Sequence, residues 1–423
     1  MNFKYVIIGG SAGGIGAVEA IRGIDRNGNI AVISDESTPQ YSKPMISEYL
    51  SGAELEEIVY RPLNFWNEHS VKILAGKKAA KVDAVSRKVI LDDGAEIVFE
   101  KLLIATGGKP IVPNIQGVEK KGVYTFTSLT DAKALLDKLP GMDRVIVVGG
   151  GLIGISLAEA LVKIGKNVTI VELKDRILSL ILDSEASILV SEVVEEAGAK
   201  IVTGRSATKI VGRKNAESEV GGVVLDDGTE LACDLVVFAI GVTPRIDMIE
   251  SKQIRVNRGV VVDRFMTTSV PDIYACGDAA EAYDFTTEDS RLLPLWPLAY
   301  VGGRIAGSNM AGLRLEYPGG TQMSSLNYFG LPVISVGMTN PPNEQYEVLS
   351  NLNREIRAYR KIVLRNNKIA GMISIGKVDG SGIIFDLLKN KVDVGEFKQK
   401  VVSDDFGLIH LSEPVRLKIL MRN

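Results

Sequence analysis

Two glycine-rich stretches have the residue types and spacing that suit pyrophosphate binding. The first follows an apolar run at residues 5–8 and extends from Gly9 to Gly14. A glycine turn of this kind lets backbone approach a pyrophosphate, and the helix after it offers free N–H groups and the positive end of its dipole. Ser11 replaces the usual second glycine, so for this stretch alone a plain tight turn is the alternative.

The second stretch repeats the pattern with all three glycines of the fingerprint. It follows the apolar run at residues 145–148 and places Gly149, Gly151 and Gly154 at the expected spacing, with Leu152 and Ile153 between the last two. Two such turns predict two bound dinucleotides.

A second repeated unit follows each glycine turn. Asp-Asp-Gly at residues 92–94 leads to Ala105, Thr106 and Gly107, and Asp-Asp-Gly at 226–228 leads to residues 239–241. The spacing within the two copies is the same. We therefore expect a hairpin with an Asp-Gly turn and a buried strand ending in glycine to occur twice.

Acidic residues follow the second predicted strand of each copy. Residues 29–34 read as a strand after a first helix at 15–23, and Asp35 and Glu36 come directly after it. Glu172 occupies the equivalent place at the end of a strand at 167–172. A carboxylate there can accept hydrogen bonds from both ribose hydroxyls. The alternative for Asp35 and Glu36 is a solvated loop acid.

The length of 423 residues allows two or three domains, and the sequence predicts an interrupted arrangement. Prolines and glycine near residue 117 mark an exit from the first domain, and a short strand ending in Gly-Asp near residue 277 marks the return. Alternating strands (334–337, 358–364, 369–374) and a helix near 382–388 predict a third, α+β domain. The predicted segments are 1–117 and 245–319 for the first domain, 118–244 for the second and 320–423 for the third.

Composition excludes several classes of protein. The formal net charge of −3 gives no nucleic-acid signature. Cys233 and Cys276 are far apart and form no redox or metal motif, which predicts a reducing, cytoplasmic setting. The chain shows no signal peptide or membrane-spanning run, so we expect a soluble protein. His69 and His410 are distant in sequence, and no metal site is expected.

Together these motifs resemble the pyridine nucleotide-disulfide oxidoreductase superfamily over nearly the full chain. The resemblance is to NADH:rubredoxin and ferredoxin reductases and to the flavin part of NADH nitrite reductases. It is carried by five motifs in order: Gly9 to Gly14, Tyr41-Ser42-Lys43-Pro44, Ala105 to Pro110, Gly149 to Gly154, and Cys276-Gly277-Asp278.

The resemblance implies an α/β fold with two Rossmann-like domains, for FAD and NAD, the second inserted in the first, plus a C-terminal α+β domain. It also implies the bound cofactors, FAD and NADH. Lys43 and Glu48 become flavin-adjacent candidates for catalytic roles. Trp296 lies along the flavin edge by resemblance, with core packing as its alternative. The expected cofactor-binding residues are Gly9, Ser11, Ala12, Gly13, Gly14, Asp35, Glu36, Lys43, Pro44, Ala79, Ala105, Thr106, Gly107, Gly149, Gly151, Leu152, Ile153, Gly154, Glu172, Gly241, Gly277, Asp278, Trp296 and Pro297.

The chain departs from the family pattern in ways that affect function. Several ferredoxin reductases pair a lysine and a glutamate beside the flavin ring, but Glu48 and Ser156 occupy those positions here. No cysteine lies between residues 41 and 47, where the disulfide reductases carry theirs. We therefore expect a reductase without a redox-active disulfide, and we expect Cys276 to be a small buried residue rather than a nucleophile.

The expected activity is transfer of electrons from NADH through FAD to a small iron protein of rubredoxin or ferredoxin type. One alternative is an NADH oxidase or peroxidase that uses dioxygen or peroxide. A second is a redox-sensing flavoprotein with little turnover. The sequence predicts no nucleic-acid or membrane partner and leaves open whether the chain forms a homodimer.

Overall fold

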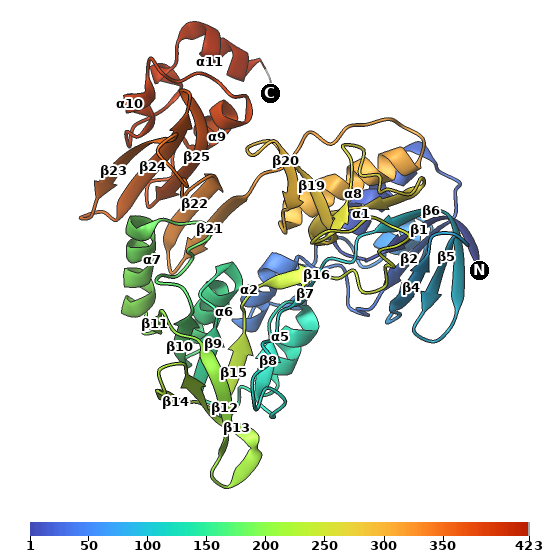
Figure 1. Cartoon of the computed structure of the whole chain (residues 1–423), viewed down its shortest axis with the longest axis horizontal. Coiled ribbons are helices and arrows are strands. Elements are labelled where there is room, and N and C mark those ends of the chain that lie inside the picture. Colours follow the sequence, from blue (N-terminus) through green and yellow to red (C-terminus); the bar gives the residue numbers. More distant parts are fainter. Residues whose placement is uncertain (422–423) are drawn as a thin grey trace. The chain divides into compact units, whose positions relative to one another are not determined.

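The computed structural model describes residues 1–421 and divides into two compact units. The first unit comprises residues 1–111, 126–140 and 241–320. The second comprises residues 112–125, 141–240 and the chain from residue 321 onward. Figure 1 shows the elements of both units coloured along the sequence.

The first unit is built on a seven-stranded sheet around β1 (Asn2–Ile8). β1 is parallel to β2 (Ile30–Ser34) on one side and to β6 (Glu96–Ile104) on the other. The apolar run at residues 5–8 is buried on both faces, as expected for a central parallel strand. The remaining strands are β3 (Val71–Ala75), β4 (Ala79–Asp83), β5 (Lys88–Leu91) and β18 (Ile273–Ala275).

Glycines allow two helices of this unit to pack closely. A Cβ on Gly303 of α8 (Trp296–Met310) would lie 1.9 Å from the carbonyl oxygen of Gly13 in α1 (Ala12–Ile24). Only glycine permits that approach. The smaller elements of the unit are η1 (Lys43–Met45), α2 (Ile46–Leu50), α3 (Leu55–Ile58), α4 (Phe65–Glu68), β7 (Gly108–Pro110), α5 (Leu129–Leu136), β16 (Val242–Pro244), β17 (Val260–Val261), η2 (Gly277–Ala279), β19 (Ala280–Asp284) and β20 (Asp289–Leu292).

Residues 126–140 fall within the segment 118–244 of the sequence prediction, but they group with the first unit. The physical link is a buried hydrogen bond from the Leu129 N–H, the first residue of α5, to the Tyr41 hydroxyl at 2.9 Å. α2 also packs against α5. The chain thus crosses to the second unit at residues 112–125, returns for α5, and crosses again at residue 141.

The second unit repeats the parallel plan. Its sheet has the strand order β11-β10-β9-β15-β8, and all its pairs are parallel. The elements are β8 (Val123–Thr125), β9 (Arg144–Val148), α6 (Leu152–Lys163), β10 (Asn167–Glu172), α7 (Ser184–Glu196), β11 (Lys200–Thr203), β12 (Ala207–Arg213), β13 (Ala216–Leu225), β14 (Glu230–Ala232) and β15 (Leu235–Phe238).

The predicted Asp-Gly hairpins are confirmed in both copies. β5 and β6 pair antiparallel across Gly94, and β13 and β14 pair antiparallel across Gly228. Their φ angles are 83° and 85°, a left-handed conformation that glycine adopts without strain. The repeat read from the sequence is therefore a structural repeat.

The C-terminal region is an antiparallel sheet with helices, within the second unit. Its strand order is β21-β22-β25-β24-β23. The predicted strands at 334–337, 358–364 and 369–374 and the helix near 382–388 are confirmed, but β21 and the exposed edge strand β23 were not predicted. The elements are β21 (Met323–Tyr328), β22 (Leu331–Gly337), β23 (Glu347–Asn353), β24 (Ala358–Arg365), β25 (Lys368–Ile375), α9 (Ser381–Lys389), α10 (Lys398–Val401), η3 (Leu408–His410) and α11 (Glu413–Leu420).

A seven-stranded sheet with a parallel core, a second sheet that is wholly parallel, the glycine turn of each and a C-terminal α+β region confirm the predicted fold class. Within residues 1–421, no helix combines the length and the apolar character needed to span a membrane.

Candidate functional site

The first glycine turn joins β1 to α1 and requires glycine at its first and last positions. Gly9 has φ 119°, and a Cβ there would lie 2.1 Å from the carbonyl oxygen of Ala105. A Cβ on Gly14 would lie 2.0 Å from the carbonyl oxygen of Gly9. Ser11 has φ −97° as N-cap of α1, so the missing second glycine does not distort the turn.

The start of α1 suits an anionic group. The Ser11 side chain makes no capping hydrogen bond, and the first turn carries no acidic residue. Ala12 and Gly13 are buried there. N–H groups at such a terminus remain to be satisfied by a ligand such as phosphate.

The second glycine turn has the same construction. Gly149 has φ 115°, and a Cβ there would lie 2.4 Å from the carbonyl oxygen of Ala239. A Cβ on Gly154 would lie 1.8 Å from the carbonyl oxygen of Gly149. α6 begins at Leu152 after the N-cap Gly151, again with no side-chain cap and no acid in its first turn. The second unit thus offers its own pyrophosphate site.

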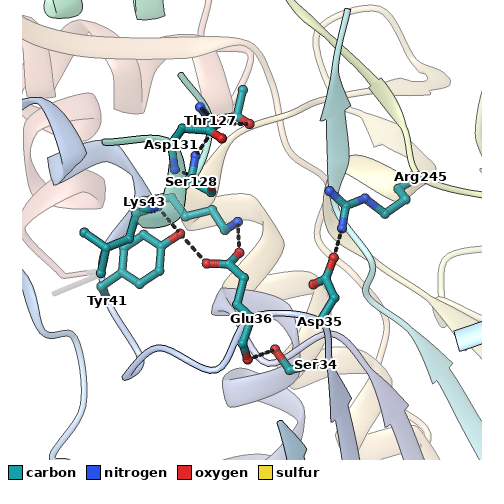
Figure 2. A network of polar contacts seen from close by, with 10 residues as sticks. Ser34, Asp35, Glu36, Tyr41, Lys43, Thr127, Ser128, Asp131 and Arg245 are labelled. Carbon is teal, nitrogen blue, oxygen red and sulfur yellow. Dashed lines mark hydrogen bonds and ion pairs between the residues drawn. The ribbon is translucent and has the colours of Figure 1, made fainter. Parts of the chain in front are cut away.

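The two acids after β2 have different partners, as Figure 2 shows. Asp35 is exposed and forms an ion pair with Arg245. Glu36 accepts hydrogen bonds from the Tyr41 hydroxyl at 2.6 Å and from Lys43 Nζ at 2.7 Å. Burial alone would raise the pKa of Glu36, but Lys43 and Tyr41 lower it. Glu36 is therefore a fixed carboxylate just after the carboxyl end of β2.

Tyr41 extends this network to α5. Its hydroxyl donates to Glu36 and accepts from the Leu129 N–H, and burial raises its pKa, with a further upward effect of Glu36. Ser128 and Asp131 form a capping box at the start of the same helix, and Thr127 Oγ1 donates to Asp131 (Figure 2). A phenol held in this way sets the distance between the loop after β2 and α5.

In the second unit, Glu172 is also held by backbone. Its Oε2 accepts from the Gly150 N–H at 2.6 Å, and its Oε1 accepts from the Lys174 N–H at 2.8 Å. These contacts place the carboxylate next to the second glycine turn.

The charge of Lys43 affects two carboxylates of the first unit, Glu36 and Asp278. Asp278 lies in η2, and burial raises the pKa of its carboxyl while Lys43 acts to lower it. Lys43 stands at the start of η1, before Pro44, and reaches Glu36 as described above. One lysine thus serves two carboxylates at this site.

Trp296 is the first residue of α8, followed by exposed Pro297. Its ring meets the Tyr60 ring edge-on with centroids 4.4 Å apart. Trp296 Nε1 is among the buried side-chain atoms of this unit without a hydrogen-bond partner within the protein, as are Thr38 Oγ1 and Gln40 Oε1. Buried polar groups are normally satisfied, so these atoms point to a polar ligand.

These observations fit FAD. The glycine turn and the uncapped start of α1 suit a pyrophosphate, and the unpaired atoms and the Asp278 carboxyl offer further polar contacts. The second turn and Glu172 fit NAD in the same way. Each site is built within one unit.

The other predicted residues have the following places. Glu48 is exposed on α2, whereas Lys43 is paired with Glu36, so these two flavin-side candidates do not pair with each other. Ala79 is buried at the start of β4. Thr106 Oγ1 donates to the carbonyl of Arg245 at 2.6 Å. Pro44 is exposed, and Ala105, Leu152 and Ile153 are partly buried. Three further positions are turn glycines with positive φ: Gly107, Gly241 and Gly277.

Both cysteines are buried and free. Burial raises the pKa of Cys233 and of Cys276 to about 12, so both thiols are protonated at neutral pH. A Cβ on Gly13 would lie 2.8 Å from Cys276 Sγ, which shows how closely that thiol packs beneath the glycine turn. No group of three potential metal ligands occurs within residues 1–421.

Sequence reasoning missed Tyr41 and Arg245 as members of the first site. Tyr41 belonged to a quoted motif, but a loop tyrosine has no spacing signature. Arg245 lies 210 residues from its partner Asp35. The strand pairing of β7 with β16 helps to bring that part of the chain back to the first unit.

Comparisons with known proteins agree with this geometry. Residues 3–303 match the family model for pyridine nucleotide-disulphide oxidoreductases, and residues 323–392 match the rubredoxin NAD+ reductase C-terminal domain. A rubredoxin-NAD(+) reductase of Pseudomonas putida is 33% identical over 66% of this chain and 72% of its own length.

Two further matches extend over almost the whole chain. The assimilatory nitrate reductase electron transfer subunit of Bacillus subtilis is 28% identical over 95% of this chain; the match spans about half, 51%, of that relative. The NADH:rubredoxin oxidoreductase of Clostridium acetobutylicum has the same fold, with a TM-score of 0.77 and 24% identity over 94% of this chain and 98% of its own. The chain therefore belongs to the pyridine nucleotide-disulphide oxidoreductase family.

Proposed function

We propose that this chain is an FAD-dependent NADH:acceptor oxidoreductase that passes electrons to a small iron protein of rubredoxin or ferredoxin type. The observation that carries the proposal is the pair of uncapped glycine-turn helices, α1 and α6, in a chain whose two thiols are buried and protonated. Two dinucleotides can bind, and electrons have no cysteine relay.

FAD, when bound, would supply the redox chemistry: it can accept a hydride from NADH, pass on the two electrons one at a time and release the proton to solvent. The residues of the chain bind and orient the two nucleotides. Glu36 is held in place by Tyr41 and Lys43 at the first site, and the charge of Lys43 also acts to lower the pKa of Asp278. Glu172 marks the ribose end of the second site, where Gly150 and Lys174 fix its carboxylate.

The predicted cofactor residues are part of this proposal. We assign the residues of the first turn, the loop after β2 and the η2 region to FAD, and those of the second turn and Glu172 to NADH. We propose the matching domain division: an FAD domain of residues 1–117 and 245–319, an NADH domain of residues 118–244, and a C-terminal domain of residues 320–423. The match to the rubredoxin NAD+ reductase C-terminal domain at residues 323–392 supports an electron-carrier protein as acceptor. Two buried cysteines without a disulfide support a cytoplasmic location.

The test is an anaerobic titration of the purified, FAD-containing protein with NADH. The proposal predicts one non-covalent FAD per chain and complete bleaching of the flavin absorbance by one equivalent of NADH. A protein that carries no flavin, or whose flavin NADH does not reduce, would contradict it. Steady-state turnover with added acceptors then separates an enzyme from a sensor with little turnover.

A further inference from the structure

The loop after Glu172 wraps around the second glycine turn. The Leu178 N–H donates to the carbonyl of Gly150 at 2.8 Å, and a Cβ on Gly150 would lie 2.9 Å from Ile177 Cγ2. Glu172 itself accepts from the Gly150 N–H. Any shift of residues 177 and 178 would therefore move the backbone that forms the nucleotide site.

The next residues of the same loop are held by the C-terminal sheet. Ser335 Oγ, on β22, donates a buried hydrogen bond to the carbonyl of Ile181 at 2.9 Å. Asn340 Nδ2 donates to the carbonyl of Leu182 at 3.2 Å. Both contacts lie within the second unit, so the loop is fixed at one end by the glycine turn and at the other by the C-terminal sheet.

A buried ion pair strengthens this second attachment. Asp183 Oδ1 caps α7 through the Ala186 N–H, while Oδ2 accepts from Lys361 Nζ at 2.8 Å and from the Tyr359 hydroxyl at 2.7 Å. The side chains of Lys361 and Asp183 are only 8% and 15% exposed. A buried charge whose partner is removed is strongly unfavourable, so the pair resists separation.

Exposed ion pairs also join α7 to the C-terminal sheet, and they allow a comparison with the buried pair. Arg354, in the turn between β23 and β24, pairs with Glu185 on α7 at 2.7 Å, with side chains 53% and 45% exposed. Exposed ion pairs of this kind contribute little to stability. The loop should therefore depend on Lys361 and Ser335 far more than on Arg354.

We propose that Lys361 and Ser335 of the C-terminal domain are positioning residues for NADH, because they fix the loop 177–183 that shapes the second glycine turn. Neither residue needs to touch the nucleotide. The inference rests on the proposed function only in taking this turn as the NADH site. It assigns the C-terminal domain a role in binding the electron donor.

The test uses the full-length, FAD-loaded protein and ADP-ribose, which carries the adenosine and pyrophosphate parts of NADH without the reactive ring. Calorimetry on Lys361→Met should show binding weakened about tenfold, and on Ser335→Ala about threefold, the effect of losing a charged and a neutral hydrogen bond. The KM for NADH should rise by the same factors while kcat stays unchanged. Arg354→Ala should bind within about twofold of wild type.

A second readout separates positioning from a general loss of stability. In the ligand-free variants, amide hydrogen exchange should speed up at residues 177–183 and stay unchanged in α9, which lies elsewhere in the C-terminal region. If Lys361→Met does not fold, Ser335→Ala and Tyr359→Phe decide the question by the same measurements.

Folded Ser335→Ala, Tyr359→Phe and Lys361→Met proteins that bind ADP-ribose as tightly as wild type would overturn this inference and leave the proposed function intact. Wild-type protein that binds neither ADP-ribose nor NADH would overturn both.

Discussion

The Tyr41 hydroxyl donates a 2.6 Å hydrogen bond to Glu36 Oε2 and so fixes the carboxylate that follows the first Rossmann-like strand pair. The same hydroxyl accepts from the Leu129 N–H at the start of α5. One phenol oxygen therefore joins two segments that are 88 residues apart in sequence. Because Glu36 also holds Lys43, this bond is central to the geometry of the first site.

Replacing Tyr41 with Phe should lower the free energy of unfolding by about 1–3 kcal/mol, because the Leu129 N–H and one Glu36 oxygen lose a buried partner. FAD should also bind more weakly. Urea unfolding and flavin release, followed by fluorescence, measure the two effects. Tyr49→Phe, on α2 of the same segment, is the matched control. Equal stability and flavin retention in the two variants would show that the Tyr41 network is unimportant.

Asp278→Asn should separate stability from flavin binding. Burial raises the pKa of Asp278, so the folded state binds a proton more readily than the unfolded state, and the charged form disfavours folding. The resulting loss in the free energy of unfolding is absent below the unfolded-state pKa. It grows as pH rises towards the folded-state pKa and is complete above it. Thermal unfolding of the flavin-free variant should thus show a higher Tm than wild type near neutral pH, with the difference shrinking on acidification.

The same Asp278→Asn variant should hold FAD less tightly, because an amide replaces a carboxylate acceptor. Equilibrium dialysis of the flavin measures this. An unchanged FAD affinity, or a Tm difference that grows in acid, would remove Asp278 from the site.

Wild-type protein should prefer NADH to NADPH, because the Glu172 carboxylate beside Gly150 would repel a 2′-phosphate. Arg176, a nearby cation, already forms an ion pair with Asp175. Glu172→Gln keeps an acceptor for the Gly150 N–H but removes the charge, so the ratio of kcat/KM for the two donors should fall by about tenfold or more. A wild-type preference for NADPH, or a ratio that Glu172→Gln leaves unchanged, would contradict the role of Glu172.

Flavin reduction by NADH should be independent of thiols. A double Cys233→Ala and Cys276→Ala variant should lose stability, by roughly 1–3 kcal/mol in total, because both side chains are buried. Its turnover per bound FAD should nevertheless equal that of wild type. Loss of turnover at full flavin content would show that Cys276 takes part in the reaction.

The parts of the fold that depend on local chemistry were predictable from the sequence. Gly9 and Gly149 need positive φ and the close approach of a neighbouring strand, and such requirements leave a fixed spacing of glycines. The Asp-Gly turns at Gly94 and Gly228 have an equally local signature.

What depends on long-range packing was not predictable. The Asp35 and Arg245 pair and the Tyr41 contact with Leu129 exist only after distant segments assemble. The strand β23 was missed because its exposed residues lack the alternation of a half-buried strand. The attachment of α5 to the first unit was missed for the same reason as the Tyr41 contact.

The measurement that tests the central claim most directly is the reoxidation of NADH-reduced enzyme, mixed anaerobically in a stopped-flow instrument with rubredoxin, ferredoxin or dioxygen-containing buffer. Because both thiols are buried and protonated, the proposed function requires electrons to pass from the flavin to the acceptor without a cysteine relay. We predict that a rubredoxin-type or iron-sulfur protein reoxidises the flavin much faster than dioxygen does, at a rate that falls as salt is added. Reoxidation by dioxygen as fast as by any iron protein tested would contradict this account and establish an oxidase instead.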